Sequence, residues 1–413
     1  MANRKIEVNE RLPLLQMLHL GLQHLFAMFG ATVLVPLLTG LPPAVALFTS
    51  GSGTLLFIAI TRGQVPAYLG SSFAFIAPIL AISGMWGLPY ALGGAMVVGA
   101  VYVIVSLIIS KIGLDWIDRV LPPVVIGSVI IVIGLGLASV GVDMAGLSSD
   151  NVTLGNPNIR ISLVTLIVTV LASMLLKGFF AVIPILIGIV VGYLFALTQG
   201  AVDFTLVREA AWISLPDFTA PKFSLAAITM MVPVALVTIA EHLGDVMVIS
   251  KVVGKEFLKE PGLHRTLLGD GVATAWAGLF GGPPNTTYGE NVGVLAITRV
   301  FSVWVIGTAA VMAVVLSFVQ KVGALISTIP EPVMGGVSIV LFGVIASSGI
   351  RTLVESGIDF GAKRNLVISS VILVLGIGGA QFEAGNFALH GMALAAVVGI
   401  LLNLVLPQIE DES

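Results

Sequence analysis

Cysteine is absent from this 413-residue chain, and charged residues make up only 10% of it. The lack of cysteine excludes disulfides and thiolate metal sites. Soluble globular proteins carry roughly 25% charged residues, so this chain lacks the polar surface that would face water. Its net charge of −3 is too small to favour nucleic acid as a partner. Hydrophobic residues reach 57%, and we therefore expect an integral membrane protein.

Long apolar runs fill most of the chain, and a helix needs about 20 mostly apolar residues to cross a bilayer. Two runs, 66–83 and 284–298, are short, begin with proline and contain polar residues, so we expect broken segments there rather than continuous helices. Fourteen spans are expected in all: 14–38, 43–61, 66–83, 90–110, 122–140, 161–176, 178–198, 224–249, 266–280, 284–298, 301–319, 332–349, 365–380 and 386–407.

The basic residues are distributed unevenly between the loops that join these spans. With fourteen spans, four of the nineteen lysines and arginines (Arg160, Arg208, Lys222 and Lys321) fall on one side of the membrane and the others on the opposite side. Positive charge concentrates on the cytoplasmic side of membrane proteins. We therefore expect a multi-pass protein of the cytoplasmic membrane with both termini in the cytoplasm.

The two halves of the chain resemble each other. A shift of 218 residues places Gln23, His24 and Leu25 on Glu241, His242 and Leu243, and Pro66 on Pro284. At a shift of 209, Gly127 and Gly134 meet Gly336 and Gly343. Because each half has an odd number of spans, seven, the second half enters the membrane inverted. Inverted repeats are typical of secondary transporters, whose substrates bind near the midplane between discontinuous segments.

Four acids lie within or at the edge of the expected spans: Glu241, Asp245, Asp270 and Glu290. A charge at bilayer depth costs several kcal/mol, so such residues indicate function unless a structural ion pair explains them. No lysine or arginine lies within the centre of a span to form one. Glu241 and Asp245 share a helix face. They repel each other when both are ionised, so we expect one to carry a proton near neutrality.

Several uncharged or weakly basic residues accompany these acids, and each has two readings. His242 either packs with a hydrogen-bonded partner or takes part in function, and packing is the more common role. Gln23 and His24 could orient the acids or bond the broken backbone. An aromatic ring such as Phe73 or Tyr288 could stack on a flat ligand or simply fill the core.

Three stretches resemble one known family, the nucleobase–cation symporter-2 or nucleobase–ascorbate transporters: "QHLFAMFGATVLVP" from Gln23, "PAYLGSSFAFI" from Pro66 and "PNTTYGENVGVLAITR" from Pro284. The family motif Gln/Glu/Pro-Asn-x-Gly-x4-Thr-Arg/Lys/Gly is met from Glu290 to Arg299. The likeness extends from about residue 11 to 407 and is strongest to bacterial uracil permeases.

The resemblance implies an all-α polytopic fold with fourteen segments in two inverted repeats and a short strand in broken segments 3 and 10. It implies a core domain (1–121 and 224–320) and a gate domain (122–200 and 330–407), with a homodimer formed through the gate. The four repeat-matched glycines should then let gate helices pass close to the core. No cofactor, metal or enzymatic activity is implied; a proton is co-transported.

In uracil permeases the base contacts residues that match Glu241, Glu290 and the backbone amides of Phe73 and Gly289, with Tyr288 nearby. Asp245 stands where those permeases have a proton-coupling histidine, and Phe342 replaces a tyrosine. Glu241 and Asp245 are thus the candidates for proton coupling. The remaining positions would support the site: Gln23, His24, His242, Asp270 and Asn291.

Two rival functions remain at this stage. A purine permease of the same family, for xanthine or uric acid, would share these motifs, and Asp245 and Asp270 both match purine-type members. An anion channel or exchanger of the wider fold should place a basic residue in the broken segments. Neither segment contains lysine or arginine, which favours a neutral base such as uracil over an anion.

Overall fold

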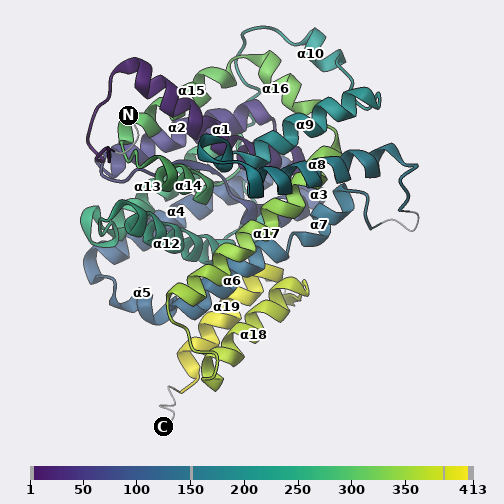
Figure 1. Cartoon of the computed structure of the whole chain (residues 1–413). Coiled ribbons are helices and arrows are strands. Elements are labelled where there is room, and N and C mark those ends of the chain that lie inside the picture. The colour runs from purple at the N-terminus through teal and green to yellow at the C-terminus, as the bar shows by residue number, and fades with distance from the viewer. Residues whose placement is uncertain (1–3, 149–151, 385–386, 408–413) are drawn as a thin grey trace.

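The computed structural model describes residues 4–148, 152–384 and 387–407, and Figure 1 shows a bundle of helices with very little sheet. Helices begin and end where the sequence provides breakers. For example, α4 (Leu88–Ile112) starts after Gly87, carries Pro89 in its first turn and stops at Gly113, and both glycines have positive φ. Proline in the first turn and glycine just after the last one are the usual end signals.

The elements of the first half follow the expected order. They are α1 (Leu14–Thr39), α2 (Pro43–Ile60), β1 (Leu69–Ser71), η1 (Phe73–Phe75), α3 (Ile76–Trp86), α4, α5 (Asp115–Val120), α6 (Pro123–Leu135), α7 (Ala138–Met144), α8 (Pro157–Leu175), η2 (Gly178–Val182), α9 (Pro184–Thr198) and α10 (Thr205–Glu209).

The second half repeats this order with small differences. Its elements are α11 (Leu225–Met231), α12 (Val234–Val253), η3 (Leu258–Gly262), α13 (Leu263–Phe280), β2 (Asn285–Thr287), α14 (Gly289–Thr298), α15 (Val303–Ser317), α16 (Gln320–Ser327), α17 (Glu331–Glu355), α18 (Lys363–Ile377), β3 (Gln381–Ala384), β4 (Phe387–His390) and α19 (Gly391–Val405).

Every expected span coincides with a helix, a pair of helices or a strand followed by a helix. Within the described residues, seven of these are long and apolar enough by themselves to cross a membrane. The others are shorter or interrupted, and α16 is bent by 84° from α15. The expected strands in segments 3 and 10 are confirmed as β1 and β2.

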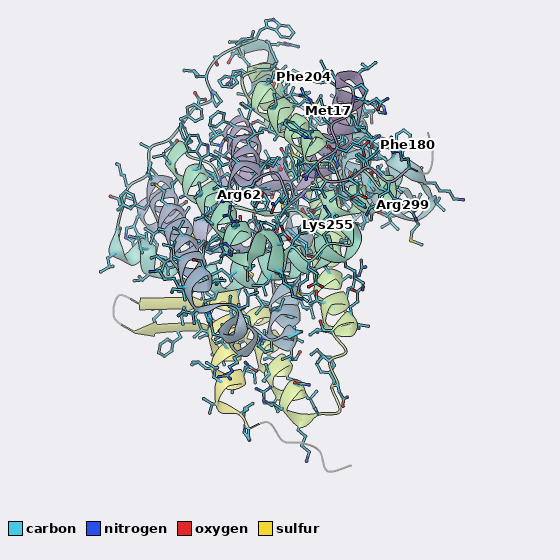
Figure 2. All side chains as sticks on the ribbon, turned by 90° about the vertical axis from the view of Figure 1, so that its left-hand side faces the viewer. Met17, Arg62, Phe180, Phe204, Lys255 and Arg299 are labelled. Carbon is cyan, nitrogen blue, oxygen red and sulfur yellow. The ribbon has the colours of Figure 1, made fainter. Side chains whose placement is uncertain are left out.

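One expected boundary is wrong. The last span was expected to begin at residue 386, yet residues 387–390 form β4, which pairs antiparallel with β3 before α19 begins at Gly391. Figure 2 shows this hairpin as two arrows that project from the side of the helices. The sequence there, "QFEAGNFALH", is apolar enough to pass for a helix end, but its alternation of apolar and polar residues also suits a strand.

The helices pack in two groups. In one group α13 lies against α4 and α2, and α15 lies against α2 and α1. In the other α17 lies against α6, α8 and α7, and α18 lies against α19 and α6. Figure 1 shows α6, α18 and α19 together at the lower end and α2 and α15 at the upper end. The groups meet where α12 contacts α6 and α19, and where α1 contacts α9.

The repeat-matched glycines do not face the first group, contrary to expectation. A Cβ on Gly134 would lie 2.4 Å from the carbonyl oxygen of Phe342 in α17, and one on Gly336 would lie 2.6 Å from that of Ser162 in α8. These glycines therefore pack helices of the second group against one another. Gly343 has open space beside it. Periodicity located the glycines but did not tell which neighbour each one faces.

Candidate functional site

Two broken segments meet in the middle of the first group through a buried two-stranded sheet. β1 and β2 pair antiparallel, with Leu69 opposite Thr287 and Ser71 opposite Asn285. The "NTT" of β2 favours an extended backbone because threonine is β-branched, and all three of its residues are buried. At depth in a bilayer such irregular backbone is tolerated only inside protein or along a cavity.

Side chains of neighbouring helices hold both strands. Thr54 of α2 donates to the carbonyl of Leu69 at 3.2 Å and accepts from its N–H at 2.9 Å, while Ser50 donates to the same carbonyl at 2.7 Å. Asn285 donates to the carbonyl of Thr49 at 3.1 Å. Sequence reasoning missed these polar contacts, although small hydroxyl residues one helical turn apart on α2 were a usable signal.

The acids of α12 face β2. Thr287 Oγ1 donates to Asp245 Oδ2 at 2.7 Å, and Thr286 Oγ1 lies 3.4 Å from Glu241 Oε2, a long and weak bond. Both acids are partly buried. The spacing of four residues therefore does bring Glu241 and Asp245 to one face, as predicted, and that face is the one toward the strands.

Glu290 lies in the first turn of α14, directly after β2, and is also partly buried. An acid in the first turn suits the positive end of the helix dipole. Its helix packs against α12, which carries Glu241. The neighbouring Gly289 is exposed, and the first N–H groups of a helix have no partner within it. Carboxylate acceptors and free backbone donors are thus gathered in one place.

The two candidate aromatic residues differ in their surroundings. Tyr288 is buried; its hydroxyl donates to the carbonyl of Ser71 and accepts from Thr32 Oγ1, both at 3.1 Å. These bonds tie it to the strand and to α1. Phe73 instead lies edge-on against Phe342 of α17, with ring centroids 5.9 Å apart and planes at 81°. Phe73 therefore faces the second group of helices, as a residue that covers a ligand would.

The supporting residues of α1 act on α14. Asn291 Nδ2 donates to the carbonyl of His24 at 3.0 Å and lies 3.2 Å from its Nδ1. His24 is buried, and this contact links α1 to the helix that carries Glu290. The side-chain oxygen of Gln23 is buried without a hydrogen-bond partner among the described residues. Of the two readings open for His24, bonding of the broken segment is the one this geometry supports.

His242 and Asp270 form a separate pair. His242 Nδ1 lies 3.0 Å from Asp270 Oδ2, and both side chains are fully buried. His242 thus lies on the side of α12 that faces α13, whereas Glu241 and Asp245 lie on the side that faces β2. The partner of Asp270 is therefore a histidine, His242, and not one of the lysines or arginines, none of which lies within the centre of a span. This buried pair connects α12 to α13.

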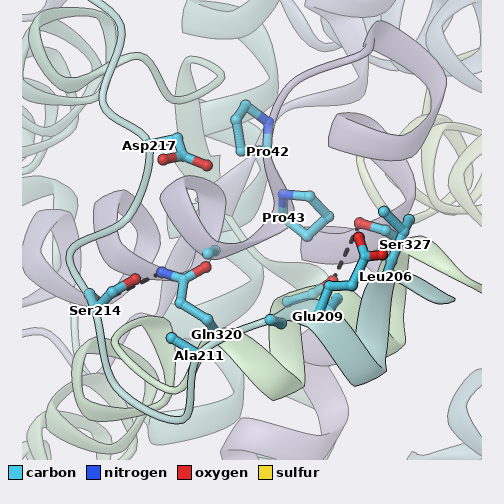
Figure 3. Close-up of a pocket in the computed structure, with 13 residues that line it drawn as sticks. Pro42, Pro43, Leu206, Glu209, Ala211, Ser214, Asp217, Gln320 and Ser327 are labelled. Atoms are coloured by element: carbon cyan, nitrogen blue, oxygen red, sulfur yellow. Dashed lines mark hydrogen bonds between the residues drawn. The ribbon is translucent and has the colours of Figure 1, made fainter. Parts of the chain in front are cut away.

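A cleft lies away from these residues. It has a volume of about 440 Å³ and is formed by α10, α16 and the start of α2, with Pro42, Pro43, Glu209, Asp217 and Gln320 on its walls. Figure 3 shows Gln320 reaching across it to the backbone of Ser214. None of the carboxylates described above contributes to this cleft. Among the described residues no group of three or more His, Asp and Glu could hold a metal ion.

The sequence also matches known proteins over nearly its whole length. A family model described as "Permease family" (Xan_ur_permease) matches residues 15–385. The chain belongs to this family, the nucleobase–cation symporter-2 family. It is 53% identical to the uracil permease of Bacillus subtilis (strain 168), over 95% of this chain and 93% of that protein. It is 51% identical to the uracil permease of Escherichia coli (strain K12), over 98% and 94%.

Solved structures share the fold at low identity. The transmembrane domain of the cyanobacterial bicarbonate transporter BicA gives a TM-score of 0.62 with 16% identity, over 96% of this chain and 98% of that chain. The murine anion transporter Slc26a9 in its inward-facing state gives 0.68 with 13% identity, over 96% and 69%. The fold of the permease described here is therefore all-α, with fourteen segments in two inverted repeats of seven.

Proposed function

We propose that this permease imports uracil together with a proton across the cytoplasmic membrane. One observation carries the proposal. Glu241, Glu290 and the exposed backbone of Gly289 lie beside the paired strands β1 and β2. The chain matches uracil permeases over nearly the whole length of both proteins and is identical to them at about half of its residues. This similarity supports the choice of base.

Uracil fits this chemistry because it is a flat ring with two N–H donors and two carbonyl acceptors. Ionised carboxylates only accept hydrogen bonds, so Glu241 and Glu290 suit the ring N–H groups. The free N–H groups near Phe73 and Gly289 suit the carbonyls, and the Phe73 ring suits the face of the base. The predicted role of Tyr288 becomes indirect in this proposal, since its hydroxyl binds Ser71 and Thr32.

Transport would proceed by alternating access, with the core (1–121 and 224–320) moving against the gate (122–200 and 330–407). The division of packing into two groups supports this proposal. Phe73 and Phe342 then meet across the moving boundary. Both termini would be cytoplasmic, lipid would surround the bundle, and two copies would associate through the gate.

Proton coupling would use Glu241 with Asp245. We propose Glu241 as the carrier because it is the acid expected to contact the base, while Asp245 is held by Thr287 at 2.7 Å. Asparagine at position 245 can still accept that bond. Asp245→Asn is therefore expected to keep uracil binding but to move the pH optimum of uptake into vesicles to more acidic values, because the negative charge beside Glu241 is gone. A shift to more alkaline values, or an unchanged pH profile, would contradict this account of the pair.

Two alternatives have specific tests. The solved structures with this fold are anion transporters, but β1–α3 and β2–α14 carry no lysine or arginine, which disfavours an anion. A purine permease of the same family remains the closer rival. Competition of xanthine, uric acid and thymine against labelled uracil distinguishes it.

The deciding experiment is uptake of radiolabelled uracil into proteoliposomes with and without an imposed proton gradient. Accumulation that depends on an acidic exterior and collapses with a protonophore supports symport. Equilibration without accumulation would contradict proton coupling, and absence of uracil uptake with uptake of a purine would overturn the choice of base.

A further inference from the structure

The first described residues, Arg4 to Arg11, lie along the short connection after α14. Ile6 forms an isolated parallel bridge with Val300, and the chain then turns at Val8 and Asn9. Ile6 N donates to the carbonyl of Arg299 at 3.0 Å, and Phe301 N donates back to the carbonyl of Ile6 at 3.0 Å. Further along, Val303 N donates to the carbonyl of Val8 at 2.9 Å. A terminal segment is usually poorly ordered unless it is tied down, and this one is bonded at regular intervals.

Side chains reinforce these backbone bonds. Val8 is only 1% exposed, and Ile6 packs on the buried cluster of Met17, Val300 and Val305. Ser302 Oγ donates to the carbonyl of Glu10 at 2.6 Å. In "IEVN" the apolar Ile6 and Val8 are less exposed than the polar Glu7 and Asn9.

The contact between the N-terminal residues and the 299–303 connection is important because it lies at the end of α14. Arg299 ends α14 in the left-handed region, with φ of 55°, a conformation that residues other than glycine adopt only sparsely. Its carbonyl is the one that receives Ile6 N. Near the other end of the same ten-residue helix stands Glu290, about 13 Å away at 1.5 Å per residue. We expect a helix this short to move as one rigid unit.

We propose that Ile6, Val8 and Glu10 are positioning residues: they hold the connection 299–303 between α14 and α15 and thereby set the place of Glu290 at the other end of α14. This inference rests on the proposed function, since Glu290 is assigned to the base there. The clamp joins the chain's first residues to the one broken segment that carries an acid.

The test is a set of single variants assayed by uracil binding to purified protein. Val8→Asp places a charge at a buried position and should weaken uracil binding about tenfold. Asn9→Asp adds the same charge at the exposed neighbouring position and should bind within twofold of wild type. Val8→Ile should also bind within twofold. Ser302→Ala, which removes one bond to the segment, should weaken binding two- to threefold.

The readout separates positioning from mere stability. Loss of folded protein lowers the number of binding sites per molecule but leaves the Kd of the folded fraction unchanged. A displaced Glu290 raises that Kd. If Val8→Asp is too unstable to purify, Ser302→Ala decides the question. A wild-type Kd in Val8→Asp, or in Ser302→Ala if that variant decides, overturns the clamp. Failure of the wild-type protein to bind uracil overturns the proposed function instead.

Discussion

The two broken segments use the same backbone arrangement to present different chemistry. In the first, β1 leads through η1 into α3, and the residue at the turn is the aromatic Phe73. In the second, β2 leads directly into α14, and Glu290 stands in the first turn. One segment thus offers a ring and the other a carboxylate, on strands that bond to each other.

The segments also differ at their far ends. α3 continues through Gly87 straight into α4, which packs along it. α14 stops at Arg299, and the N-terminal segment bonds to the connection that follows. The segment that carries the charge is therefore the one with the additional restraint. A hydrogen bond to a carboxylate needs closer placement than contact with a ring face, which gives the difference a physical reason.

The largest effect should come from the acidic side of this comparison. Glu290→Gln replaces a carboxylate, which only accepts hydrogen bonds, with an amide that also donates. We expect uracil affinity to fall by on the order of 1.5–3 kcal/mol, or tenfold and more. Titration of purified protein with uracil measures it. Glu256→Gln removes the same charge at an exposed position and serves as control; equal affinities in all three proteins would remove Glu290 from the site.

A smaller effect should follow from the junction of the strands. A Cβ on Gly70 of β1 would lie 2.5 Å from the Tyr288 ring, so Gly70→Ala must displace that ring and its bonds to Ser71 and Thr32. We expect a loss of roughly 1–3 kcal/mol of stability, as for other overpacked sites. Thermal unfolding in detergent measures it.

Gly293 of α14 provides the matched control, because nothing lies within 4 Å of a Cβ built there. Gly293→Ala should leave the unfolding temperature unchanged or slightly raised, since alanine favours a helix over glycine. If Gly70→Ala is as stable as Gly293→Ala, the strand junction is more adaptable than its contacts suggest.

The smallest effect should come from the aromatic side. Phe342→Leu removes the edge-on partner of Phe73 while keeping an apolar side chain. We expect uracil binding to weaken by about 0.5–1.5 kcal/mol, the value of an aromatic pair. Uptake should slow by more than binding weakens. Initial uptake rates and equilibrium binding, compared on the same preparation, test this. A loss of uracil affinity as large as that of Glu290→Gln would mean that the two segments contribute equally to binding of the base.

Sequence patterns predicted the span positions because hydrophobicity must match the bilayer, and they predicted the broken segments because proline, glycine and acids are costly there. They also predicted that Glu241 and Asp245 share a face, since that follows from helix geometry alone. The partners of those acids, Thr286 and Thr287, could not be predicted, because strand pairing depends on residues far apart in the chain.

Other features escaped prediction for related reasons. The N-terminal segment is polar overall, so its few apolar residues did not suggest burial; only the position of Val8 against the 299–303 connection makes it significant. The direction in which Gly134 and Gly336 face depends on which helices pack together. The His242–Asp270 pair is formed between helices α12 and α13 and left no spacing signal in the sequence.

The pairing of β1 with β2 also constrains how the protein is made. Leu69 bonds with a strand whose Thr287 lies 218 residues later, and chains are synthesised at roughly 5–20 residues per second. The first strand therefore enters the bilayer on the order of ten seconds before its partner exists. Ser50 and Thr54 of α2 bond the backbone of Leu69 in the complete structure, so we expect these two hydroxyls to satisfy it before β2 arrives.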